Sequence, residues 1–538
     1  MRSQRSARAA LERLFAIDLR SLAAFRLCIG LVLLADLAVR AGNLEQHYSD
    51  TGILPRTDFY RLFLVSPWHW SIHGLSGAPG VQALLLALAG AAALALTVGY
   101  RTRLATFLSW VLLASLHARN PMLQYGADHL LRMLLLWSMF LPLGSRWSLD
   151  QLRRGARPAG RHLSWASVAI MLQVFLLYSF SGVFKMNDAW FGGDALRAAL
   201  SMDMYAKPLA DGLTAFPGML AVASPAIPWL ELICALLLFV PVATLRLRAL
   251  ALVLLASFHL SVEFLLETGM FQYLSVGALL LFLPGAAWDW LAAARPVRSL
   301  RARIARGVTS RARGSTDCGE HVPGTSLRTF AQDAAQALCA LLLIYVVIWN
   351  VCSLSARQYT RQHSPAWMSE AGDGNFRYSL LLPGYGVERM LGPVGWIGRA
   401  AQLHQRWNMF EEGGGSRDGW HVVVGTLEDG RRLSLLEGGL AYAGRSHPKP
   451  KDTSALYADT RWRVYFTYLI QASRAHELLP RIIARQWNDQ HPDLRVRELE
   501  ILHVQEPALP GGEGTARRIT TWFQGSVVES EGGTGGDS

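Results

Sequence analysis

The residue of this chain best placed for chemistry is a lysine at the end of an apolar run. Lys185 lies just beyond the run Val168–Tyr178, and the polar residues Asn187 and Asp188 follow it directly. A lysine so close to hydrocarbon is costly unless it snorkels, pairs or takes part in chemistry. Burial favours the neutral amine, which is a general base. Such a base suits a lipophilic substrate with an acidic proton, such as a quinol, whereas a snorkelling anchor is the structural alternative.

Further ionisable residues lie near the ends of neighbouring apolar runs. His259 and Glu263 are four residues apart and share a helical face. His117, Asp128 and His129 lie at the ends of two other runs. Because ionisable groups at membrane depth are functional candidates by default, these residues and Lys185 predict a site at one end of a helical bundle.

Each of these residues also has a structural interpretation. Asp128 and Arg132 are spaced to form an ion pair on one helix, and we favour that interpretation over a functional one. His259 and Glu263 are as well explained by a hydrogen-bonded pair as by catalysis. Their spacing resembles a pair of metal ligands, but no convincing third ligand accompanies them, so no metal is predicted.

Composition places the chain in a membrane. Its 538 residues are 51% hydrophobic and only 17% charged, with a formal net charge of +12. The arginines cluster between apolar runs, which fits membrane topology better than a nucleic-acid surface. The five cysteines show no CxxC spacing, so neither a zinc site nor a disulfide framework is expected.

The apolar runs predict about nine transmembrane helices, since a bilayer core needs roughly 20 apolar residues per helix. The spans are Leu22–Ala41, Val81–Tyr100, Leu104–Ala118, His129–Leu143, Leu163–Phe184, Pro228–Ala243, Ala249–Leu266, Met270–Trp290 and Ala331–Leu354. Arginine-rich segments occupy alternate connections, and the positive-inside rule makes that face cytoplasmic. The N-terminus is then cytoplasmic, and the chain after the last span is extracytoplasmic.

We therefore predict an α-helical polytopic membrane protein with a C-terminal extracytoplasmic α+β domain. Residues 1–20 form a cytoplasmic segment and residues 21–354 the transmembrane domain, which includes a basic cytoplasmic loop at 291–329. Residues 355–525 form the α+β domain, with a hairpin at Asp429-Gly430, helices over 461–489 and strands over 494–506 and 518–523. Residues 526–538 are predicted to be a disordered tail.

Several stretches together resemble the vitamin K-dependent γ-glutamyl carboxylases and their bacterial relatives, the horizontally transferred transmembrane (HTTM) domain proteins. The most specific is Tyr178-Ser-Phe-Ser-Gly-Val-Phe-Lys-Met-Asn-Asp-Ala-Trp-Phe-Gly-Gly193, the lysine segment. The others are Ile17–Arg26 followed by His47–Pro55, Ser257–Ser261 with Gly269–Tyr273 and Leu281–Pro284, and Gln405–Phe410. The chain departs from the carboxylases in having Phe184 where they carry a second lysine.

The resemblance implies a mechanism. In the carboxylases the lysine of this motif deprotonates vitamin K hydroquinone, and oxygen converts the anion to a strong base that ends as the epoxide. That base removes a γ-proton from a peptide glutamate, and the carbanion takes up CO₂. The resemblance puts Lys185 in the base position and suggests His259 and His117 as further catalytic residues. Candidates for substrate binding are Asn120, Asp128, His129, Trp190, Glu263 and Gln272.

The sequence thus predicts a multi-pass protein of the cell membrane that oxygenates a lipid hydroquinone in the manner of these carboxylases. The expected cofactor is reduced vitamin K or menaquinol, with O₂ and CO₂. The expected partners are membrane lipid and a secreted or membrane peptide, with no nucleic acid. Carboxylation of glutamate is left open, since no propeptide-binding portion is recognisable. A non-catalytic scaffold that binds lipid, quinone or a partner is the alternative.

Overall fold

The computed structural model describes most of the chain. The described residues are 2–63, 67–155, 160–293, 326–356, 385–411, 417–436, 439–440, 447, 449–450, 452–469, 479–507 and 518–527. Most of the predicted basic loop 291–329 and most of the predicted tail 526–538 lie outside them.

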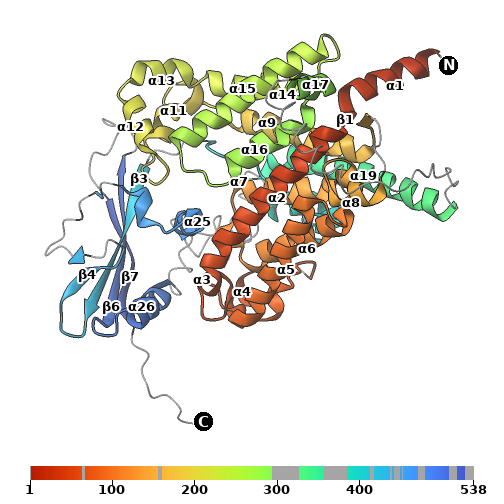
Figure 1. Ribbon diagram of the computed structural model, residues 1–538. Coiled ribbons are helices and arrows are strands. Elements are labelled where there is room, and N and C mark those ends of the chain that lie inside the picture. The colour runs from red at the N-terminus through yellow and green to blue at the C-terminus, as the bar shows by residue number, and fades with distance from the viewer. Residues whose placement is uncertain are drawn as a thin grey trace.

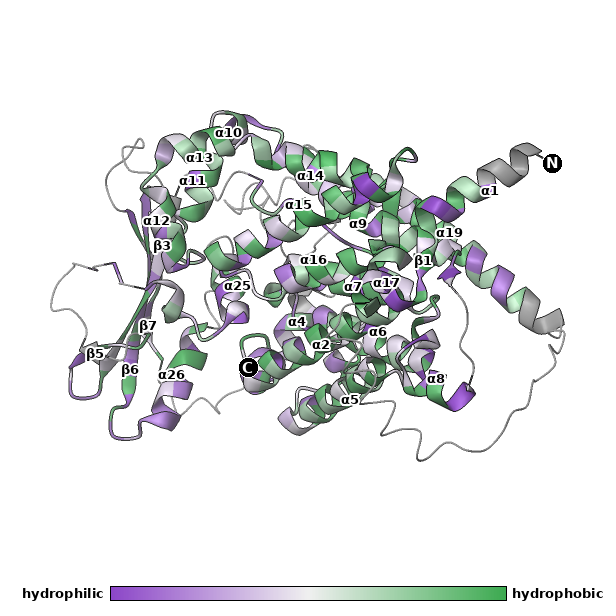
Figure 2. Ribbon diagram, turned by 45° about the horizontal axis from the view of Figure 1, so that its top comes forward, coloured by the Kyte–Doolittle hydropathy of each residue, from purple (hydrophilic) through white to green (hydrophobic). Residues whose placement is uncertain are grey.

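A bundle of helices forms the larger part of the protein, and a small sheet domain lies at one end of it (Figure 1). Each of the nine predicted apolar runs coincides with a helix. These helices are α2 (Leu19–Gly42), α5 (Pro79–Val98), α6 (Thr102–Arg119), α7 (Gly126–Ser138), α9 (Trp165–Phe184), α14 (Ala226–Leu237), α15 (Thr244–Leu265), α16 (Phe271–Leu279) and α19 (Ser326–Ser353). Figure 2 shows that much of the ribbon of these helices is coloured as hydrophobic.

Six stretches of the described chain are long and apolar enough to cross a membrane. Five are single helices, α2, α5, α9, α15 and α19, and the sixth runs from Pro217 through α14 to Leu237. A seventh is possible if α16 and α17 (Gly285–Ala293), which are bent by 99°, form one broken span. Helix α7 has only 13 residues, about 20 Å at 1.5 Å per residue, and is enclosed by other helices. Nine crossings therefore remain a prediction.

Shorter helices join the bundle helices. Between α9 and α14 they form a small cap with its own apolar cluster, which includes Leu200, Ala210 and Leu220. These are α10 (Asp188–Phe191), α11 (Ala195–Leu200), α12 (Pro208–Thr214) and α13 (Pro217–Ala223). Others are α1 (Arg2–Phe15), α3 (Leu44–Tyr48), α4 (Arg56–Phe63) and α8 (Leu149–Arg154), and the two-residue strands β1 (Ile17–Asp18) and β2 (Arg161–His162) pair with each other.

The C-terminal domain is built on an antiparallel sheet with the strand order β5-β4-β3-β6-β7. Its strands are β3 (Arg417–Leu427), β4 (Arg432–Ser434), β5 (Gly439–Leu440), β6 (Val496–Pro507) and β7 (Arg518–Ser526). The predicted hairpin is confirmed: β3 and β4 pair around Gly430, whose φ of 83° suits glycine. The predicted strands after residue 494 correspond to β6 and β7. Helices α25 (Thr460–Leu469) and α26 (Leu479–Gln490) correspond to the predicted helical region, with Pro480 in the first turn of α26.

Buried polar contacts tie the C-terminal part to the bundle. Arg461, at the start of α25, forms ion pairs with Asp36 of α2 and with Asp128 of α7. The segment before β3 also enters the bundle: the Trp349 indole donates to the carbonyl of Gln405, 3.0 Å away. The predicted α+β domain is therefore anchored inside the helical end that faces it, in agreement with the views of Figures 1 and 2.

Helices α9 and α14 pack closely at a glycine. A Cβ atom at Gly182 would lie 2.8 Å from the Leu232 side chain and 3.0 Å from the Pro228 carbonyl oxygen. Because nothing larger than hydrogen fits there, the two backbones approach each other within a turn of Ser181 and Lys185.

The ion pairs of Arg461 predict a large loss of stability when that side chain is removed. Arg461→Ala leaves the buried carboxylates of Asp36 and Asp128 with one guanidinium partner, that of Arg40, instead of two. Such a change typically costs about 3–5 kcal/mol of stability. Thermal unfolding in detergent would measure it. The control is Arg497→Ala, which removes an exposed arginine from the same domain and should change little. Equal melting temperatures for both variants would contradict the anchoring role.

Candidate functional site

Lys185 lines a cavity of about 360 Å³ where the bundle meets the C-terminal domain. Helices α9, α10, α11, α14, α15 and α16 contribute to its wall, and Met409, Phe410, Thr460 and Val464 of the C-terminal part complete it. Most of the other lining side chains are apolar or aromatic. They include Leu177, Leu196, Ile227, Phe258, Val262, Leu266 and Phe271.

Within the cavity Lys185 is paired with a carboxylate. Its Nζ lies 2.9 Å from Oε2 and 3.1 Å from Oε1 of Glu231, which comes from α14. Ser181, one turn earlier on α9, accepts a hydrogen bond from Nζ at 2.5 Å and donates one to Glu231 Oε1 at 3.0 Å. Lys185 and Glu231 are each only 4% exposed, so water screens this pair little.

A second hydrogen-bonded chain lines the same cavity. The Tyr178 hydroxyl lies 2.8 Å from His259 Nε2, and His259 Nδ1 lies 2.5 Å from the Gln272 side-chain oxygen. Gln272 in turn donates to the Thr268 hydroxyl at 2.9 Å. With the Gln272 amide in this orientation, Nδ1 carries the imidazole proton and Nε2 accepts from Tyr178. The imidazole is therefore held as one tautomer.

Trp190 contributes an aromatic face to the wall. Lys185 Nζ lies 5.9 Å from the centre of its ring, within the range of a cation–π contact. The indole N–H donates to the Phe410 carbonyl at 3.0 Å. Asn187 donates to the nearby Glu411 carbonyl. The polar residues after Lys185 thus position the C-terminal segment against the cavity.

The structure places four of the nine predicted site residues in the cavity lining: Lys185, His259, Trp190 and Gln272. The other five lie outside that lining. Glu263 pairs with Lys207 at 3.1 Å rather than with His259, four residues before it. His117 and Asp128 belong to a separate polar cluster around α6 and α7, and Asn120 and His129 lie beside that cluster.

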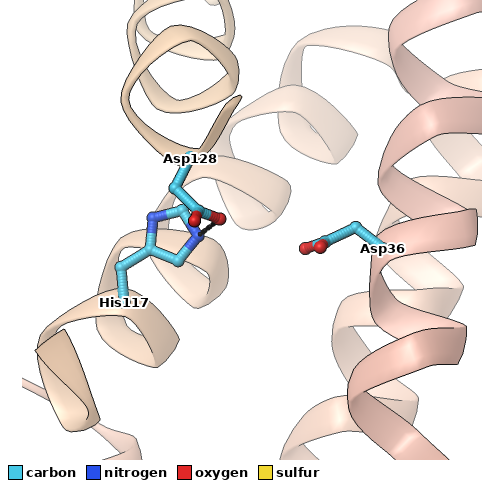
Figure 3. A group of neighbouring side chains, drawn as sticks. All are labelled: Asp36, His117 and Asp128. Atoms are coloured by element: carbon cyan, nitrogen blue, oxygen red, sulfur yellow. Dashed lines mark ion pairs between the residues drawn. The ribbon is translucent and has the colours of Figure 1, made fainter. Parts of the chain in front are cut away.

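That cluster, which we call the arginine–aspartate cluster, consists of Asp36, Arg40, His117, Asp128 and Arg461. Figure 3 shows Asp36 facing His117 and Asp128 across the gap between their helices. Asp128 Oδ1 lies 2.7 Å from Arg40 Nη2 and 3.0 Å from His117 Nε2. Asp36 and Arg40, four residues apart on α2, also pair at 2.8 Å. Two buried carboxylates thus face two buried guanidinium groups.

The predicted pair of Asp128 with Arg132 is wrong. The Arg132 guanidinium instead donates to the carbonyl oxygens of Gln402, at 3.0 Å, and His404, at 2.7 Å. Arg40 and Arg461 satisfy Asp128 in its place. Helical spacing predicts neighbours on one helix only. The partners of Asp128 come instead from two other helices, α2 and α25.

Asn120 and His129 make local contacts beside the cluster. Asn120 donates to the His47 carbonyl at 2.8 Å. His129 Nδ1 lies 3.2 Å from Arg132 Nη2. Both side chains are buried, so each helps to satisfy neighbouring polar groups.

Asp36, His117 and Asp128 also place one potential metal-ligand atom each within 4.8 Å of one another (Figure 3). The carboxylate oxygens of Asp36 and Asp128 already accept hydrogen bonds from Arg40 and Arg461. A divalent cation would have to displace these guanidinium groups and meet their positive charge. The cluster is therefore better explained as an ion-pair anchor than as a metal centre.

Comparison with known families matches residues 15–290 to the HTTM domain, which is more than half of the chain. The chain belongs to the HTTM domain family. This family comprises membrane proteins related to the vitamin K-dependent carboxylases. No curated protein and no solved structure matches the chain. The HTTM match contains Lys185, Glu231 and His259, whereas Arg461 and the sheet domain follow it.

Sequence reasoning missed Glu231 and Tyr178 in the cavity of this HTTM protein, and Arg461 in the arginine–aspartate cluster. Glu231 is an acid inside a predicted apolar span, and that position alone should have marked it as a candidate. Tyr178 belongs to the lysine segment but was not given a role. Arg461 is 333 residues from Asp128 in the sequence, and no local pattern connects the two.

Two buried histidines outside the bundle helices, His47 of α3 and His73 of the short 3₁₀ helix His73–Leu75, predict how the stability of the HTTM protein depends on pH. Burial lowers the pKa of His47 to about 3 and that of His73 to about 3, so both are neutral in the fold. The unfolded chain takes up these protons below roughly pH 6.5. Stability is therefore lost as pH falls, by about 2 kcal/mol per histidine at pH 5.

Melting temperatures at pH 7 and pH 5 would measure this loss. His73 Nδ1 contacts the Ser115 hydroxyl at 2.7 Å, a contact that His73→Gln can replace. The variant should show a smaller drop between the two pH values than the wild type. An identical drop in both proteins would show that His73 does not contribute.

Proposed function

We propose that this protein is an integral membrane enzyme that deprotonates and oxygenates a lipid hydroquinone in the Lys185 cavity. The observation that carries the proposal is an amine buried in an apolar cavity and held beside a carboxylate, at the lysine of a carboxylase-like motif. A few polar groups placed in a mostly apolar pocket are typical of sites that bind and orient a small molecule.

The cavity suits a hydroquinone ring. Its volume of about 360 Å³ falls within the range of small-molecule sites, and its walls offer aromatic faces from Trp190, Phe258 and Phe271. Helices α14 and α15 also carry exposed apolar side chains on their other faces, so they separate the cavity from lipid by a single layer. These side chains include Trp229, Ile233, Leu260 and Phe264.

The polar residues have distinct roles in this proposal. A bound hydroquinone supplies an acidic hydroxyl and the electrons that reduce oxygen. Lys185 takes the hydroxyl proton at Nζ, and Trp190 packs beside the amine. Tyr178 and His259 present a hydrogen-bonded chain that can orient a second polar group of the substrate. The apolar walls exclude water, which strengthens each of these interactions.

The finer assignments follow the family resemblance. The hydroquinone is reduced vitamin K or menaquinol, and CO₂ and a peptide glutamate are the further substrates if carboxylation is retained. The protein then lies in the cell membrane with its C-terminal domain extracytoplasmic. A secreted or membrane peptide would reach the site from that side.

A non-catalytic scaffold is the second candidate. One observation favours it: Lys185 already has Glu231 and Ser181 as partners, as a purely structural lysine would. In that case the cavity would bind lipid or quinone without turnover.

Epoxide formation from reduced phylloquinone and reduced menaquinone tests the proposal, using purified protein in detergent with oxygen. Lys185→Met should reduce turnover by about 10²–10⁴-fold, the usual contribution of a general base. The matched control is Lys207→Met, which removes another lysine paired with a glutamate but outside the cavity lining. It should retain wild-type turnover.

Labelled bicarbonate and a glutamate-containing peptide, added to the same assay, distinguish a carboxylase from an epoxidase alone. Label in the peptide would support the full reaction. A folded wild-type protein that forms no epoxide from either quinol would overturn the enzyme assignment and favour the scaffold.

A further inference from the structure

The hydrogen bonds around Lys185 raise a question about how it becomes a base. Its Nζ lies within hydrogen-bond distance of Ser181 Oγ and of both Glu231 carboxylate oxygens. An ammonium that donates to these acceptors has three N–H bonds and no lone pair. It cannot accept a proton until it has lost one.

We propose that Glu231 is a catalytic residue that takes a proton from Lys185 and so generates the base, an inference that rests on the function proposed above. The proton moves from Nζ to Oε2 over a heavy-atom distance of 2.9 Å. The N–H bond breaks and an O–H bond forms, which converts an ammonium and a carboxylate into an amine and a carboxylic acid. The net charge of the pair stays at zero throughout.

The surroundings of the pair favour this transfer. Both groups are 4% exposed, and the cavity beside them is lined mainly by apolar side chains. Water would stabilise the separated charges, whereas an apolar site penalises them more than the neutral pair. Among the described residues that line the cavity, Lys185 is the single positively charged side chain.

Ser181 connects Lys185 and Glu231 by hydrogen bonds. Its hydroxyl donates to Glu231 Oε1 at 3.0 Å and accepts from Lys185 Nζ at 2.5 Å. The close packing of α9 on α14 at Gly182 brings these three side chains together. When the hydroquinone proton moves to the Nζ lone pair, the new ammonium stays beside the hydroquinone oxygen that lost the proton. Glu231 keeps its own proton during that step.

Activity measured against pH tests the inference, because Glu231→Gln removes the acceptor and keeps the shape. At neutral pH we expect turnover to fall about 100-fold or more, with little change in KM for the quinol. Turnover should recover as pH rises, because solvent hydroxide can then deprotonate the amine. Glu231→Asp should retain intermediate activity. The other titratable groups that line the cavity are Tyr125, Tyr178, Tyr205, His259 and Glu267.

Adding Glu231→Gln to a Tyr178→Phe/His259→Gln background and repeating the pH series separates the titration of Tyr178 and His259 from that of the Lys185–Glu231 pair. Recovery of Glu231→Gln at high pH must persist when these two groups are absent. A variant Glu231→Gln with wild-type turnover at neutral pH, or with a loss that is the same at every pH, would overturn the inference.

Infrared spectroscopy distinguishes failure of this inference from failure of the proposed function, because it needs no turnover. A protonated carboxylic acid shows a C=O stretch that shifts in D₂O and should disappear in Glu231→Gln. The control is Glu263→Gln, which removes a carboxylate outside the cavity lining and should leave the band intact. Absence of the band in the wild type would show that Glu231 does not hold the proton, whether or not the protein makes epoxide.

Discussion

The fold depends on a buried charge contact between two parts of the chain that are far apart in sequence. Arg461 reaches from α25 to Asp36 and Asp128 in the helical bundle. Each carboxylate would be costly to bury alone, and so would the guanidinium. The bundle and the C-terminal domain therefore satisfy each other's charges. Helix α25 also lines the cavity through Thr460 and Val464, so the same contact completes the proposed site.

Much of the fold follows from local patterns in the sequence. Hydropathy located a helix at each of the nine predicted runs, because an apolar segment of that length has few other stable conformations. The alternation around Asp429-Gly430 located a β-hairpin for a similar reason. Whether every helix crosses a membrane is a different matter. Most of the 13 residues of α7 are apolar because other helices surround them, and hydropathy alone cannot distinguish that burial from lipid.

The site was predicted less completely, because its partners come from separate helices. Lys185 stood out through its position at the end of an apolar run, and Glu231 could have been found by the same argument. Asp128 shows the limit of such reasoning. Helical spacing suggested Arg132 as its partner, whereas Arg40 and Arg461 fill that role through tertiary packing. A contact across more than 300 residues leaves no local signal in a single sequence.

The site also depends on the absence of a side chain at Gly182. The distance between Lys185 and Glu231 is set by how closely α9 and α14 can approach, and a hydrogen atom at position 182 sets that limit. A related protein with alanine there could keep every polar residue of the cavity and still hold its amine and carboxylate too far apart to share a proton. Conservation of the lysine and the glutamate alone would then be a poor guide to activity within the family.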